Sequence, residues 1–174
     1  MHKHSITKII SGGQTGADRA GLMAGKKLNI ETGGWCVKDY RTEDGIDLEL
    51  KNFGIKCLDS IEYPERTKKN VDDSDGTIVF RLQPSLGSDK TIGYAQSKIW
   101  KYGVIKTMNK IESKYKAVCV ITNIDNEDVA SEQILNFVLK NDIKILNIAG
   151  HRESSAPIKN FSEKVERIVY NALK

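Results

Sequence analysis

The stretch KIISGGQTGAD, residues 8–18, decides how this chain begins to fold. Lys8 to Ser11 have the apolar, β-branched character of a short strand, and from Asp18 to Leu28 the apolar side chains recur at helical spacing. Three glycines join the two segments and let the backbone turn sharply and approach a ligand, because no Cβ atom intervenes. A strand, a glycine-rich turn and a helix form the first unit of an α/β fold.

The same alternation continues along the rest of the chain. Further strands are expected at Glu31–Cys36, Gly76–Phe80, Ala117–Thr122 and Lys144–Gly150, and further helices at Thr91–Trp100, Val129–Lys140 and Phe161–Leu173. Strands that are separated by helices form right-handed crossovers and feed a parallel sheet. We therefore predict a Rossmann-like α/β fold, a doubly wound and mostly parallel sheet flanked by helices, as a single domain over residues 1–174. In such sheets ligands bind outside the carboxyl ends of the strands.

The composition is that of an ordinary globular chain, with 39% hydrophobic and 29% charged residues among 174. The 27 basic and 23 acidic residues leave a net charge of +4, spread along the chain, which favours a small anionic ligand over a nucleic acid polymer. The longest apolar run, Ala117–Ile121, is far too short for a membrane span, and the first ten residues lack the apolar region of a signal peptide. We therefore expect a cytoplasmic protein without a membrane partner. Cys36, Cys57 and Cys119 are far apart and have no metal-ligand spacing.

The glycine-rich loop is the strongest candidate for a binding site. The start of a helix offers unpaired N–H groups and the positive end of the helix dipole to an anion, and Thr15 and Gln14 can add hydrogen bonds. The glycine spacing matches neither the dinucleotide fingerprint nor a P-loop, which argues against ATP hydrolysis. The candidate ligand-binding residues here are Gly12, Gly13, Gln14, Thr15, Gly16 and Asp18. The alternative is a tight turn in which Asp18 only caps the helix.

Two more groups of candidates lie between residues 33 and 76. Gly34 permits close approach of the backbone, Trp35 can stack on a planar ring, and Arg41 can pair with a phosphate or carboxylate. Arg66 and Asn70 are four residues apart, so on a helix they share a face and can address one group. The alternatives are a Trp35 that belongs to the core, a surface ion pair for Arg41, and a helix that only connects two strands.

The last candidates lie in GSDKT, residues 87–91, and in NIAGHRES, residues 147–154. The first resembles a second anion-binding loop before a helix, and its candidates are Gly87, Ser88 and Thr91. The second is a strand end followed by polar residues, where Arg152 can face a phosphate. Helix capping alone explains the first stretch equally well, and an ion pair with Glu153 is the alternative for Arg152.

Groups that transfer protons or act as nucleophiles are few. The histidines are His2, His4 and His151, so a Ser-His-Asp arrangement would have to use His151. No HxxxH or HExxH spacing indicates a metal site. We therefore predict no catalytic residue and no metal ligand, and we interpret the glycine-rich stretches as a site that holds a ligand.

Taken together, these stretches resemble the family of molybdenum-cofactor carrier proteins. The shared segments are SGGQTGADRA, then GGW-C followed by Arg41 and EDG, then the Y, RT, NV and SDGT of residues 63–77, and finally LNIAG-RES. The resemblance covers about residues 9–155, with good coverage up to Thr77 and sparse agreement from there to Leu146. Each motif is weak alone, but their common order is specific.

This resemblance implies a Rossmann-like fold related to the lonely-guy-type nucleotide-binding superfamily, assembled as homodimers or homotetramers. It also implies non-catalytic binding, protection and transfer of the molybdenum cofactor, a pterin dithiolene that bears a phosphate. The positions carried over as ligand-facing are the loop from Gly12 to Asp18, Gly34 with Trp35, Arg41, and Arg66 with Asn70.

The chain also departs from the family pattern. It has Gly87-Ser88-Asp89 where the family has Gly-Gly-Thr, His151 where a proline is common, and Val37-Lys38-Asp39-Tyr40 instead of proline-lysine-glycine-arginine. Three alternatives to a carrier therefore stay open. They are a binding protein for a nucleotide or nucleotide-derived signal, a nucleotide N-glycosidase or phosphoribohydrolase, and a purely structural protein. The enzyme would need a carboxylate in the cleft, and its PGGxGTxxE signature is missing from this chain.

Overall fold

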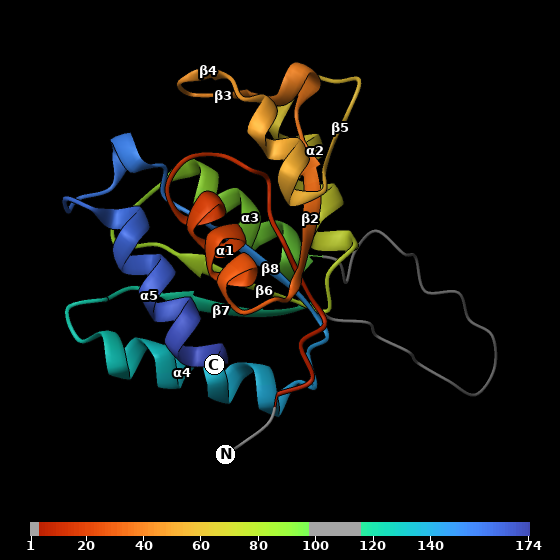
Figure 1. Ribbon diagram of the computed structural model, residues 1–174. Coiled ribbons are helices and arrows are strands. Elements are labelled where there is room, and N and C mark those ends of the chain that lie inside the picture. The colour runs from red at the N-terminus through yellow and green to blue at the C-terminus, as the bar shows by residue number, and fades with distance from the viewer. Residues whose placement is uncertain (1–3, 98–115) are drawn as a thin grey trace.

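The computed structural model describes residues 4–97 and 116–174 and is built around a parallel sheet (Figure 1). Its strands are β1 (Lys8–Ile10), β2 (Glu31–Cys36), β5 (Ile55–Cys57), β6 (Gly76–Phe80), β7 (Ala117–Ile121) and β8 (Ile145–Gly150). The order across the sheet is β5-β2-β1-β8-β6-β7, and every neighbouring pair is parallel. A separate antiparallel hairpin joins β3 (Arg41–Thr42) to β4 (Gly45–Ile46).

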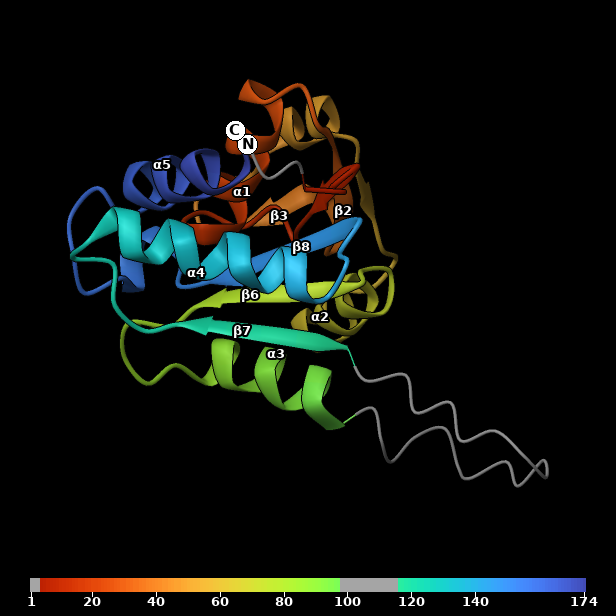
Figure 2. The same ribbon diagram turned by 90° about the horizontal axis from the view of Figure 1, so that it is seen from below.

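Helices cover both faces of the sheet. They are α1 (Ala17–Lys27), α2 (Tyr63–Asp72), α3 (Leu86–Ser97), α4 (Glu127–Lys140) and α5 (Phe161–Leu173). α5 packs against both α1 and α4, whereas α2 packs against α3 (Figure 2). The predicted Rossmann-like α/β fold is confirmed. In the two described ranges, no helix is both long and apolar enough to cross a membrane.

The strand order creates a switch point beside β1. From β1 the chain runs outward through β2 to β5, and then it crosses to β6 and β7 on the other side. β8 returns last and fills the position between β1 and β6. In open α/β sheets the crevice at the carboxyl ends of the strands beside such a point is where ligands bind.

Two clusters of buried side chains fix the helices to the sheet. The larger one joins β1, β6 and β8 to α1, α4 and α5, and Ile9, Ile78, Ile148 and Phe161 in it are fully buried. Each such side chain contributes about 1.5–3 kcal/mol through burial. The smaller cluster, centred on Leu50, lies under β2 and β5. The strand ends that carry the candidate residues are therefore anchored in a packed core.

One predicted boundary is wrong in a way that changes the site. The helix expected at Thr91–Trp100 begins at Leu86, so GSDKT forms its first turns instead of a loop. The Asp89 amide donates to the Ser85 carbonyl (2.8 Å), and Thr91 Oγ1 donates to the Gly87 carbonyl (3.0 Å). A glycine costs a helix only about 1 kcal/mol, which the packing of α3 against β6 and β7 offsets. The expected part of this helix beyond Ser97 lies outside the described residues.

β5 and the β3–β4 hairpin have no counterpart in the prediction. β5 has three residues and each hairpin strand has two, which is too short for a period-two pattern to show. The remaining boundaries differ by a residue or two, as for α4, which begins at Glu127 and is capped by the Asn126 side chain instead of starting at Val129.

Candidate functional site

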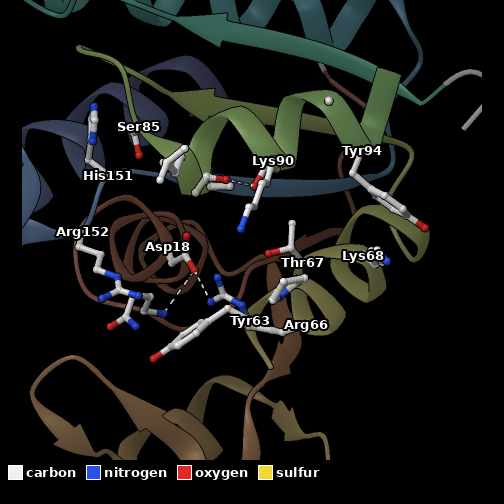
Figure 3. A pocket seen from close by; sticks show the side chains of 18 of the residues that line it. Asp18, Tyr63, Arg66, Thr67, Lys68, Ser85, Lys90, Tyr94, His151 and Arg152 are labelled. Carbon is white, nitrogen blue, oxygen red and sulfur yellow. Dashed lines mark hydrogen bonds and ion pairs between the residues drawn. The ribbon is translucent and has the colours of Figure 1, made fainter. Parts of the chain in front are cut away.

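A pocket of about 810 Å³ opens at the carboxyl ends of β1, β6 and β8, beside the switch point (Figure 3). Its walls come from the start of α1, from α2, from α3 and from the segment after β8. The lining residues are Gln14, Asp18, Tyr63, Pro64, Arg66, Thr67, Lys68, Ser85, Leu86, Gly87, Lys90, Thr91, Gly93, Tyr94, Ala149, Gly150, His151, Arg152 and Ser155. This volume suits a small organic ligand.

The pocket wall is positively charged. Four lining side chains are cationic, namely Arg66, Lys68, Lys90 and Arg152, whereas Asp18 is the one lining carboxylate among the described residues. Cations that line a concave, low-dielectric wall reinforce one another's potential and attract an anion.

Asp18 and Arg66 form a buried ion pair at the base of the pocket. Arg66 Nη1 donates to Asp18 Oδ2 at 3.0 Å, with the two side chains 15% and 7% exposed. The Gln14 amide donates to the same oxygen at 3.3 Å. Burial raises the pKa of Asp18, while Arg66 and the backbone amides act in the opposite direction. Asp18 therefore orients Arg66 as well as the start of α1.

Gly12 makes room for this arginine. A Cβ atom on Gly12 would lie 1.8 Å from Arg66 Nη1 and 2.2 Å from its Cζ. The glycine was predicted to admit a ligand to the backbone, but in this structure the space is filled by the protein's own guanidinium group. The loop thus contributes to the pocket by holding a cation against it.

A second guanidinium group contacts the same aromatic ring as the first. Arg66 Cζ and Arg152 Cζ lie 5.6 Å and 5.1 Å from the centroid of the Tyr63 ring, within cation–π distance. Arg66 comes from α2 and Arg152 follows β8, so only the tertiary fold brings them to the same ring. Two planar forks at one end of the pocket suit a phosphate, which can accept several hydrogen bonds at once.

α2 and α3 form the other end. Lys68 Nζ lies 5.7 Å from the centroid of the Tyr94 ring, and Lys90 points from α3 into the cavity toward α2 (Figure 3). The site residues predicted from the sequence did not include Tyr63, Lys68, Lys90 or Tyr94. The four-residue spacing of Lys90 and Tyr94 places them on one face of α3, but whether that face lines a cavity is decided by the packing of α3 against α2.

His151, the residue that follows β8, connects the end of β8 to the segment between β6 and α3. Its Nε2 accepts hydrogen bonds from the amides of Leu82 (3.1 Å) and Gln83 (3.3 Å), so the neutral ring carries its proton on Nδ1. Burial, together with the positive charge of Arg81, lowers the pKa of His151. The histidine therefore stays neutral and holds the β6–α3 connection against the end of β8.

Three polar atoms of lining residues are buried without a hydrogen-bond partner within the described part of the chain. They are Gln14 Nε2, Arg66 Nε and His151 Nδ1. All three are donors when His151 has the tautomer given above. Each of these atoms is covered by the protein itself, so the three donors belong to the walls of the pocket and do not face its open space.

The backbone amides of the glycine-rich loop were expected to face an anion, but they bind other groups of the protein. The amides of Gly13, Gln14, Thr15 and Ala17 already donate to Ser11 Oγ, Asp18 Oδ2, Gln14 Oε1 and the His151 carbonyl. The four N–H groups are thus occupied inside the protein instead of facing an anion. Of the predicted loop residues, Gln14 and Asp18 line the pocket, whereas the others form the turn behind it.

Thr15 and Gln14 link the loop to the β3–β4 hairpin. Gln14 Oε1 accepts from the Glu43 amide (2.9 Å), and the Glu43 carboxylate accepts from the hydroxyl groups of Thr15 and Ser154. Burial opposes the ionised form of Glu43, but the hydrogen bonds from Ser154 and Thr15 prevail and lower its pKa. Thr15 therefore fixes the hairpin next to the segment that follows β8.

The predicted residues around β2 lie outside the pocket lining. Asn70 Oδ1 accepts from the Trp35 amide and its Nδ2 donates to the Trp35 carbonyl, both at 2.9 Å, so it joins α2 to β2. Trp35 Nε1 donates to Asp73 Oδ2 (2.7 Å). Gly34 has φ +123, and its Cβ would lie 2.1 Å from the Ser11 carbonyl oxygen. Arg41 is exposed on the hairpin.

Of the residues predicted in the two later segments, some line the pocket and others do not. Gly87, Thr91 and Arg152 line the pocket, whereas Ser88 is buried on another side of α3 with its hydroxyl group unpartnered among the described residues. Gly16 has φ +75, and its Cβ would lie 2.2 Å from the His151 carbonyl oxygen, so it serves the contact between α1 and the segment after β8. The ligand-binding roles of all these residues remain predictions.

The described residues contain no group of three or more histidine, cysteine or acidic side chains arranged to hold a metal ion.

The model of the circularly permutated YpsA SLOG family matches residues 9–173. The chain belongs to this family. The solved structure of a "Putative molybdenum carrier protein" from Syntrophus aciditrophicus is similar to this SLOG-family chain over its whole length. The two share 32% of their residues, the match covers 99% of this chain and 98% of the other, and the TM-score is 0.81. Among curated proteins, none matches.

The resemblance inferred from the glycine motifs is thereby confirmed at the level of family and fold. The comparison reaches through the later part of the chain, including the segment from Thr77 to Leu146, where the motifs agreed only sparsely.

Proposed function

We propose that this SLOG-family protein holds a phosphate-bearing heterocycle in the pocket at the carboxyl ends of β1, β6 and β8, and carries it without changing it. The molybdenum cofactor is the ligand that we propose, in line with the name of the similar solved structure. The observation that carries the proposal is a pocket wall with four cationic side chains and, among the described residues, a single carboxylate.

The roles of the residues follow from their positions. Arg66 and Arg152, which share the Tyr63 ring, would hold the phosphate through their forked donors. Lys90 would add charge from the opposite wall, and Tyr94 offers an aromatic surface to a planar ring. No cysteine is among the lining residues that the structure describes. The chain would therefore bind this cofactor through its phosphate and its ring, and the metal would be coordinated by the dithiolene of the cofactor and not by a cysteine of the pocket.

Asp18 is the residue that tests the hydrolase alternative. Its Oδ2 atom accepts from Arg66 and Gln14, so a hydrolase would have to use Oδ1 to activate water or to protonate a leaving group. Release of free base from nucleoside monophosphates, abolished by Asp18→Asn, would contradict the carrier proposal and support an enzyme instead.

The decisive experiment loads the protein and identifies what it binds. We expect molybdenum and pterin fluorescence to co-elute with the protein after anaerobic incubation with a cofactor-loaded donor. Thermal shift with a panel of nucleoside monophosphates tests the nucleotide alternative, because a ligand at a hundred times its Kd stabilises by about 2.7 kcal/mol. A shift with a nucleotide, and no cofactor in the eluate, would replace the proposed ligand.

Variants then test the pocket itself. Arg152→Gln and Lys90→Gln should each weaken binding about 10- to 100-fold, since a hydrogen bond to a charged group contributes about 1.5–3 kcal/mol. Lys159→Gln is the matched control, because Lys159 is exposed outside the pocket lining. Arg41→Gln separates the two site predictions: it should leave binding unchanged if the pocket is the site. Equal losses in all four variants would contradict the assignment.

We also propose that the protein assembles as a homodimer or homotetramer, as the family resemblance implies. Light scattering coupled to gel filtration measures the assembly directly, and a monomer at all concentrations would refute it.

A further inference from the structure

Two of the three cysteines, separate in the sequence, meet in the fold. Cys36 ends β2 and Cys57 ends β5, and the two residues are direct partners in the parallel register of these strands. Their Sγ atoms lie 3.4 Å apart, and both thiols are free. Neither residue lines the proposed ligand pocket, so this pair is a separate feature of the molecule.

The surroundings bring the two thiols together but expose them differently. Cys36 is 1% exposed and belongs to the small cluster around Leu50. Cys57 is only partly buried, on the strand at the edge of the sheet. Its sulfur also accepts a hydrogen bond from the Tyr40 amide at 3.2 Å, which orients it beside Cys36. Solvent-borne reagents therefore reach Cys57 first.

We propose that Cys36 and Cys57 form a reversible oxidation site that takes a peroxide as its two-electron oxidant and closes to an intramolecular disulfide. The sulfur atoms need to approach from 3.4 Å to about 2.05 Å, a movement that side-chain rotation and small strand shifts can supply. Their alignment on adjacent strands keeps the second thiol in place when the first reacts.

The chemistry proceeds in two displacements. The thiolate of Cys57 attacks one peroxide oxygen, the O–O bond breaks, and the departing hydroxide takes a proton to become water, which leaves a sulfenic acid on Cys57. The sulfur of Cys36 then attacks the sulfenic sulfur, the S–O bond breaks, and the hydroxide that leaves takes the Cys36 proton. Overall, two thiols and one hydrogen peroxide give one disulfide and two waters, with both sulfurs oxidised and the peroxide reduced.

The two cysteines divide the roles because of their surroundings. Burial raises the pKa of the Cys36 thiol to about 12, so Cys36 stays protonated and is protected from direct oxidation. It reacts only with a partner that is already in contact. Dithiol reductants reverse the bond by attacking the accessible sulfur of Cys57.

Mass spectrometry of the full-length protein tests the proposal. After treatment with hydrogen peroxide and alkylation of free thiols, we expect Cys36 and Cys57 to escape alkylation and their peptides to be linked. We expect Cys119 to remain alkylatable in the denatured protein, and dithiothreitol to restore both thiols. In the Cys36→Ser variant, a dimedone adduct should accumulate at Cys57 because no thiol resolves the sulfenic acid. Cys119→Ser is the matched control and should form the disulfide as the wild type does.

Several outcomes would overturn the proposal. They are full alkylation of both residues after oxidation, a disulfide that forms only between molecules, or conversion of Cys57 to sulfinic acid without a linked peptide. If Cys36→Ser does not fold, the peptide mapping of the wild type still decides. Because the measurement needs no ligand, its result is independent of the function proposed for the pocket.

Discussion

Replacement of Arg66 by methionine should destabilise the fold, because it leaves the buried carboxylate of Asp18 without its cation. The two groups are 3.0 Å apart and their side chains are 15% and 7% exposed, so water compensates little for the loss. Removal of one partner from a buried pair costs about 3–5 kcal/mol. The Gln14 amide still supports Asp18, so we expect about 3 kcal/mol. At about 2–4 °C per kcal/mol, the melting temperature would fall by about 6–12 °C.

Urea unfolding followed by far-UV circular dichroism measures this loss. The matched control is Arg167→Met, which removes an arginine from its ion pair with Glu127 (2.7 Å), where the arginine side chain is 55% exposed. An exposed pair contributes about 0–1 kcal/mol, so this variant should stay close to the wild type. The double variant Asp18→Asn with Arg66→Met should recover part of the loss, since the buried negative charge is gone.

The pH dependence provides an independent check. Burial raises the pKa of Asp18, and Arg66 opposes this effect, so the pKa rises further in Arg66→Met. An acid whose pKa is higher in the folded state binds more protons when folded, and the folded state therefore gains stability as the pH falls through that pKa. The deficit of Arg66→Met should thus shrink as the pH is lowered from about 7 toward 5. A loss of stability in Arg66→Met no larger than in Arg167→Met, or an equal deficit at both pH values, would show that the buried pair does not stabilise the fold in this way.

Three shorter predictions concern other parts of the fold. Gly16→Ala should cost about 2–5 kcal/mol in urea unfolding, because its φ is +75 and its Cβ would lie 2.2 Å from a carbonyl oxygen, whereas Gly93→Ala on α3 has open space and should cost nothing. The pKa of His151 is lowered in the folded protein, so the neutral ring stabilises the fold above about pH 6.5, and this stability is lost as the pH falls through the pKa of the folded state. His151→Gln removes the titrating group, so its stability should fall less steeply than that of the wild type between about pH 7 and 5. A disulfide between Cys36 and Cys57 would close a loop of about 20 residues and should raise the free energy of unfolding by about 3 kcal/mol, and equal stability of the oxidised and reduced forms would contradict that.

The site was predictable only in part, and the physical reason is visible in Arg66 and Asn70. Their spacing correctly indicated one face of a helix, and α2 does contain both. Arg66 lines the pocket, whereas the side-chain amide of Asn70 hydrogen-bonds to the backbone of Trp35 on β2. Local spacing can place two side chains on a common face, but only the neighbouring strand decides which of them meets a cavity and which meets protein.

The same distinction applies to the glycines. A glycine-rich turn signals that backbone or side chains approach closely, but it does not say what approaches. Gly12 accommodates the guanidinium group of Arg66 and Gly16 accommodates the carbonyl of His151, so in this fold the close neighbours are parts of the same chain. Lys68, Lys90 and Tyr94 carry no local signal, and the packing of α2 against α3 is what makes them neighbours.

The sequence by itself determined the alternation of strands and helices, the parallel sheet, and the edge of that sheet where the pocket opens, because hydrophobic periodicity and glycine turns act over a few residues. Only the tertiary structure decided which amides are already satisfied, which cations surround one cavity, and that Cys36 lies beside Cys57. Those relations join residues that are distant along the chain, and they depend on the order in which the strands assemble, which no local pattern encodes.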